Sequence, residues 1–83
     1  MDQLKLYRRF LLKLNDYFNN HPPTAGLRNT LADLSAATGM GVMSISIIRK
    51  FAEQNYIPFP DMITKQDIVA RLKEIDQLAQ QRL

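Results

Sequence analysis

Residues 31–50 read LADLSAATGMGVMSISIIRK, and this stretch decides the fold. From Leu31 on, apolar residues recur at positions i, i+3 and i+6, which is the spacing of one face of a helix. Gly39 then ends the pattern, because glycine readily adopts the left-handed conformation that commonly follows a helix. A second helical pattern starts near Val42 and runs to about Asn55. The stretch therefore predicts two short helices joined by a tight turn.

Two helices that cross at about 90–120° through a tight turn form a helix-turn-helix. Small residues let the two helices approach closely, and apolar residues lock them together. Ser35 and Gly39 serve close approach, and the apolar residues are Leu34, Met40, Val42, Ile45 and Ile48. The stretch resembles the helix-turn-helix of phage repressors, and its turn, GMG at residues 39–41, is similar to that of the lambda-type repressors. Members of that family often have alanine where this chain has Ser35.

The segment that follows, YIPFP at residues 56–60, carries a second resemblance. It is similar to the aromatic and proline-containing exit of the helix-turn-helix in the excisionase and AlpA-like group of small prophage regulators. Together the two resemblances cover roughly residues 31–60. They imply a small DNA-binding regulator of transcription or recombination, of phage, prophage or plasmid type.

Two longer amphipathic helices are predicted outside this centre. The first ends at NNHPP, residues 19–23, because proline cannot continue a helix. Thr30 with Asp33, and Thr64 with Asp67, match the capping pattern in which side chains satisfy the free N–H groups of a first turn. The predicted helices lie near residues 3–19, 30–38, 42–55 and 64–81. The predicted inner face of the third helix consists of Ile45, Ile48, Ala52 and Tyr56.

The predicted fold class is all-α: one small four-helix domain over residues 1–83, with a central helix-turn-helix. No β-wing is expected, because two prolines follow the third helix and no segment alternates like a half-buried strand. A chain of 83 residues has room for one modest core. It has no cysteine, and no apolar run approaches the roughly 18 residues that span a membrane. We expect a cytoplasmic protein without membrane contact.

The formal net charge of +3 lies near the N-terminus. Residues 1–30 carry five basic and two acidic side chains, whereas the charges balance in each of the two remaining parts. Lys5, Arg9 and Lys13 are spaced i, i+4 and i+8, so they form a strip along the first helix. The strip predicts contacts with DNA phosphates, and a solvated helix face is the alternative.

The outward face of the third helix is the predicted DNA-binding surface if the mechanism of the resembled families carries over. Its residues, with Arg49 on the flank, are Met43, Ser46, Ile47, Arg49, Lys50 and Gln54. Lys50 suits guanine or phosphate, Gln54 suits adenine, and Ser46 suits a base edge or phosphate. Met43 and Ile47 suit only thymine methyl groups. The alternative is a protein-binding module, such as an antirepressor or inhibitor, that presents Met43 and Ile47 to a protein partner.

The last helix carries a narrow apolar seam, formed by Ile68, Leu72, Ile75 and Ala79. The seam fits packing onto the first helix of the same chain, and it also fits a homodimer through Ile68, Leu72 and Ile75. We expect no catalytic, metal or cofactor site, and therefore no enzyme. His21 is the only histidine and has no partner at a suitable spacing, and the three glycines do not form a phosphate-binding loop.

Overall fold

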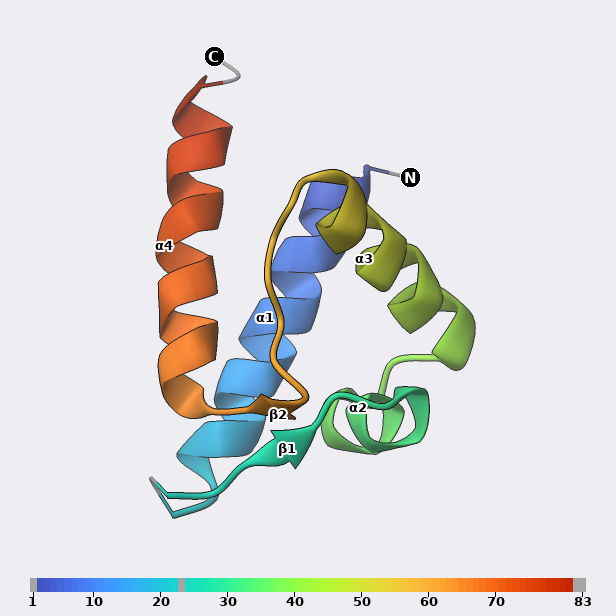
Figure 1. Cartoon of the computed structure of the whole chain (residues 1–83), viewed down its shortest axis with the longest axis vertical. Coiled ribbons are helices and arrows are strands. Elements are labelled where there is room, and N and C mark those ends of the chain that lie inside the picture. Colours follow the sequence, from blue (N-terminus) through green and yellow to red (C-terminus); the bar gives the residue numbers. More distant parts are fainter. Residues whose placement is uncertain (1, 23, 82–83) are drawn as a thin grey trace.

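The structure is a computed structural model that describes residues 2–22 and 24–81, with side chains described up to Gln77. Its elements are, in chain order, α1 (Gln3–Asn19), β1 (Leu27–Arg28), α2 (Leu31–Thr38), α3 (Val42–Gln54), β2 (Met62–Ile63) and α4 (Lys65–Gln81). The predicted all-α domain is confirmed, and each helix begins and ends within one residue of its predicted range. In Figure 1, α1 lies between α4 on one side and α2 with α3 on the other.

Local capping interactions explain these boundaries. The Thr30 hydroxyl oxygen accepts a hydrogen bond from the Asp33 backbone N–H over 3.1 Å and donates to the Asp33 carboxylate over 2.6 Å. At the start of α4, the Thr64 backbone N–H donates to the Asp67 carboxylate over 2.8 Å. Gly39 ends α2 with φ of 71°. Both capping pairs and the glycine stop predicted from the sequence are therefore confirmed.

The core lies between α1 and the elements on its two sides. From α1 it receives Leu6, Tyr7, Phe10, Leu11, Leu14 and Phe18. The seam of α4 faces the same core, since Ile68 is 0% and Ile75 is 2% exposed, and Leu72 packs against them partly buried. Of the two alternatives for this seam, packing within one chain is the one that the structure contains. The side chain of Ala79 lies outside the described residues.

A two-stranded antiparallel ladder joins two segments for which the sequence predicts no strand. Leu27 pairs with Ile63, and Arg28 pairs with Met62. The Asn29 N–H extends the contact by donating to the Asp61 carbonyl over 2.8 Å. Each strand has two residues, so neither shows an alternating pattern in the sequence. The strands flank α2 and α3 in the chain, so within the described part of the chain they form no hairpin wing.

The predicted place of Tyr56 in the core is wrong. Because α3 ends at Gln54, the backbone turns left-handed at Tyr56, with φ of 54°, and the side chain is 94% exposed. The Ile57 N–H closes the helix end by donating to the Ala52 carbonyl over 2.9 Å. Phe51 supplies the missing core aromatic, with its ring 5.4 Å from that of Tyr7.

Among the described residues, no single helix is both long enough and apolar enough to cross a membrane. Only α2 and α3 taken together reach the length and apolarity for a span, and a bend of 112° separates them.

Candidate nucleic-acid interface

The bend of 112° between α2 and α3 lies within the range of a helix-turn-helix. Side chains of α2 hold the turn in place. The Ser35 hydroxyl donates to the Met40 carbonyl over 2.8 Å, and the Met40 N–H donates to the Thr38 hydroxyl over 3.1 Å. Ser35 is the position where the resembled repressors often have alanine, and here its hydroxyl satisfies a carbonyl of the turn.

Buried apolar side chains lock the two helices together. Leu34 from α2 and Ile45 and Ile48 from α3 are fully buried and share the core with α1. Met40, inside the turn, is buried as well. The angle of α3 relative to the body is therefore set by packing on two sides, which keeps its opposite face in a defined position.

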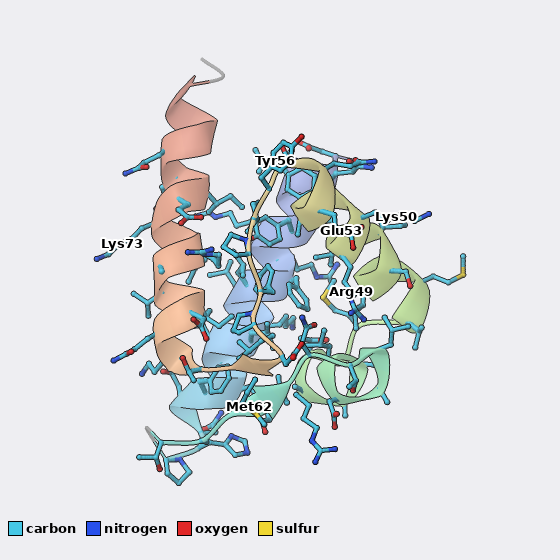
Figure 2. The ribbon with its side chains drawn as sticks, viewed as in Figure 1. Arg49, Lys50, Glu53, Tyr56, Met62 and Lys73 are labelled. Carbon is cyan, nitrogen blue, oxygen red and sulfur yellow. The ribbon has the colours of Figure 1, made fainter. Side chains whose placement is uncertain are left out.

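Most of the predicted binding residues share the exposed face of α3. Met43 is 81% and Ile47 is 41% exposed, Lys50 and Gln54 are exposed, and Ser46 is half-buried at the edge. Figure 2 shows the Lys50 side chain pointing away from the body of the protein. Val42, which the sequence analysis did not include in this face, is also exposed at the start of the helix.

Arg49 lies apart from this group. Figure 2 shows it on the side of α3 that faces the linker, which we define as residues 55–61 between α3 and β2. There it lines a small cavity together with Asn29 and Phe59. Arg49 and Lys50 are neighbours in the sequence, but a step of 100° along the helix directs them to different surroundings.

Two cations of the predicted phosphate strip lie beside the start of α3. Arg9 and Lys13 line a hollow together with the Gly39–Gly41 turn and Ser44, in the first turn of α3. Lys5 lies farther along α1, where it lines a separate hollow with Asp2 and Arg9. The structure thus brings two of the three predicted phosphate ligands next to the helix-turn-helix.

These cations keep their charge available to a partner. Among the described side chains, the only ion pair joins Arg71 and Glu74 on α4, over 2.9 Å. Arg9, Lys13 and Lys50 therefore have no carboxylate within salt-bridge distance in that part of the chain. The N-cap of α3 is Gly41, which makes no side-chain capping hydrogen bond, so the first N–H groups of the helix lack a side-chain partner.

His21 packs and hydrogen-bonds against Tyr17. Its Nδ1 lies 2.6 Å from the Tyr17 carbonyl oxygen, to which it donates, and its ring stacks on that of Tyr17 at 4.0 Å. A search of the described residues finds no group of three or more His, Cys, Asp or Glu side chains that could hold a metal ion.

We compared the chain with protein-family models, curated proteins and solved structures, and none of them matches. We therefore infer a function from the two helices and the cations described above.

Proposed function

We propose that the protein is a small DNA-binding regulator that inserts α3 into the major groove of duplex DNA. The observation that carries this proposal is the 112° bend between α2 and α3, which leaves the outer face of α3 free over its full length. The core residues of α3 all lie on the opposite side. Regulation of transcription or recombination is the role that the resemblance to phage repressors and excisionases favours.

The cations on α1 support the same orientation. A helix that enters the major groove is flanked by phosphates, and these are bound by basic side chains and by helix N-termini. Arg9 and Lys13 lie beside the start of α3, whose uncapped N–H groups carry a partial positive charge. Phosphate contacts there would fix the register of α3 without reading the sequence.

Base reading by this face would be modest. Lys50 is the cation at its centre and suits guanine, and Gln54 suits adenine one turn further on. Met43 and Ile47 would contribute apolar contacts with thymine methyl groups. The face has no outward arginine or asparagine for a bidentate contact, so most of the affinity would come from phosphates.

The test is fluorescence anisotropy with a mixed-sequence duplex at several salt concentrations. We expect log Kd to depend linearly on log salt, with a slope of about 0.9 per phosphate contact. The double variant Arg9→Gln/Lys13→Gln should reduce this slope by about 2. Lys73→Gln is the matched control, because Lys73 is exposed on α4, across the molecule from α3 (Figure 2). Absence of binding at low salt, or equal slopes for both variants, would reject the proposal.

A protein-binding module is the second candidate. Val42, Met43 and Ile47 form an exposed apolar patch on the first half of α3, and Met43 is almost fully exposed. Exposed apolar patches with a polar edge are typical of protein interfaces. In that case DNA would not bind at low salt. A protein partner would be retained at high salt and lost in Met43→Ser/Ile47→Ser.

A further inference from the structure

A small cavity opens between α3 and the linker, on the side of α3 away from Lys50. Its volume is about 70 Å³. The walls are apolar and come from three helices, the linker and β2, and they include Phe10, Leu34, Ile48, Ala52, Phe59 and Ile63. Most of these side chains belong to the buried core, so the cavity reaches into the centre of the domain.

Two polar residues line this otherwise apolar cavity. Arg49 is one of them; it is also exposed to solvent and has no carboxylate within salt-bridge distance among the described side chains. Asn29 is the other; it is half-buried, and its backbone is fixed by the hydrogen bond to the Asp61 carbonyl. A cation and an amide next to an apolar cavity match a ligand with an apolar body and an anionic head.

The linker forms the outer wall of the cavity. Ile57 and Phe59 are only half-buried, and the linker has no regular secondary structure, as its course in Figure 1 shows. The Arg71 guanidinium ties it to α4 through one hydrogen bond to the Pro58 carbonyl, over 3.1 Å. The Ile57 N–H also donates to the Ala52 carbonyl, the Asn29 N–H donates to the Asp61 carbonyl, and the Phe59 ring packs edge-on against Phe10 and Tyr7. The linker is therefore held in place, and a ligand has to fit the cavity at its present size.

We propose that this cavity binds a small carboxylic acid, with its apolar body between Ile48, Phe59 and Ile63. The carboxylate would pair with the planar Arg49 guanidinium and accept a hydrogen bond from the Asn29 amide. An apolar cavity of about 150 Å³ binds benzene, so this cavity of about 70 Å³ has room for a short branched chain of roughly three carbons and not for a ring. Ligands of that size reach a Kd of about 10 µM to 1 mM. This inference goes beyond DNA binding and does not depend on it.

The first experiment is a titration of the ¹³C-methyl-labelled protein, without nucleic acid, followed by NMR. The probe is 2-methylpropanoate, whose apolar body has three carbons. We expect saturable shifts of the Ile48 and Ile63 methyl signals, while Ile75, which lies outside the cavity, stays unchanged. The neutral analogue 2-methylpropanamide and the short acid acetate should each bind about tenfold more weakly or worse, because the amide lacks the charge and acetate lacks the branched apolar body. Absence of saturable shifts up to about 10 mM, ten times the weakest expected Kd, would overturn the proposal.

Three variants test whether the cavity is a ligand-binding site or only an unfilled space in the core. Arg49→Gln should weaken the binding of 2-methylpropanoate by about tenfold or more. Lys50→Gln, which removes the neighbouring cation on the outer face, should bind the acid like the unchanged protein. Ala52→Val adds two methyl groups to the cavity wall and should abolish binding while the domain remains folded, as judged by its NMR spectrum. Equal affinity in Arg49→Gln, or retained binding in folded Ala52→Val, would overturn the proposal.

Discussion

Tyr7 buries a hydroxyl group for which the described part of the chain offers no hydrogen-bond partner. Its side chain is 1% exposed, and its ring packs against Phe51 and, edge-on, against Phe59 at 6.2 Å. Desolvation by burial raises the pKa of this hydroxyl far above its ordinary value of 10.0, although the nearby Arg71 cation opposes the shift. A buried hydroxyl without a partner costs about 1–3 kcal/mol.

Tyr7→Phe should therefore raise the free energy of unfolding by about 1 kcal/mol at neutral pH, since it keeps the ring and removes the unpaired group. The pH dependence has a definite sign. Above pH 10 the unfolded chain releases the Tyr7 proton and the folded chain keeps it, so stability falls with rising pH by up to about 1.4 kcal/mol per unit. Tyr7→Phe should lose this fall. Urea denaturation at pH 7 and in steps above pH 10 measures both effects.

The exposed Tyr56 provides the control for this experiment. Tyr56→Phe should leave the stability at neutral pH unchanged, because the Tyr56 side chain is 94% exposed. A loss of stability in Tyr7→Phe at neutral pH would contradict the prediction and indicate that the hydroxyl has a partner, such as a buried water.

Tyr56 also occupies a backbone conformation that suits glycine. With φ of 54° directly after α3, it stands where helices usually end on glycine. The left-handed conformation costs a side chain roughly 1 kcal/mol, and the exposed ring returns little packing energy. Tyr56→Gly should raise the free energy of unfolding by about 0.5–1 kcal/mol, and the melting temperature should rise with it. Asn55→Gly, at φ of −105°, should lower it, because the Asn55 side chain donates to the Phe51 carbonyl. The opposite order of the two variants would contradict this account.

At the scale of the element, the helices were predictable because their ends are determined locally. Thr30, Thr64 and Gly39 act on backbone groups within a few residues, so the sequence around each boundary contains the necessary information. The wrong prediction that Tyr56 lies in the core also comes from a helix end that is determined locally. Helical spacing continues to residue 56, but the backbone has already left the helix.

The strands and the cavity were not predictable because they depend on contacts between distant residues. Leu27 pairs with Ile63 across the whole helix-turn-helix, and two-residue strands show no period. The position of Arg49 next to the cavity depends on the course of the linker, which helical spacing does not describe. The exposed face of α3 was predictable, since the opposite face is uniformly apolar.

The contrast between Arg49 and Lys50 leads to a prediction about α3 as a DNA-reading element. Lys50→Ala should weaken binding to a selected DNA site by about 1–3 kcal/mol if Lys50 contacts a base. Arg49→Ala should have a smaller effect, because its side chain faces the linker and not the outer face. Anisotropy with the selected site and with a mixed duplex measures both. Unchanged affinity in Lys50→Ala would exclude Lys50 from the interface.

At the scale of the whole molecule, α1 connects the other three helices. One side packs against α4, another supports α2 and α3, and its exposed side carries Arg9 and Lys13 next to the turn. Two of the five basic side chains in residues 1–30 thus lie beside the turn between α2 and α3. The arrangement uses the apolar seam of α4 within the chain, which leaves Ile68 and Ile75 without exposed surface for a second copy.

This use of the seam predicts how stability responds to substitution and to concentration. A domain of this size is stable by roughly 4–12 kcal/mol, and Ile68→Ala should remove about 2–4 kcal/mol, because it leaves a cavity between α1 and α4. Val69→Ala, on the exposed side of the same helical turn, should lower the free energy of unfolding by less than about 1 kcal/mol. For the unchanged protein, the urea midpoint should stay constant over about a hundredfold range of concentration, since Ile68 and Ile75 are already buried within one chain. A midpoint that rises with concentration in the unchanged protein, but not in Ile68→Ala, would instead show that the seam binds a second copy and that α4 leaves α1 to do so.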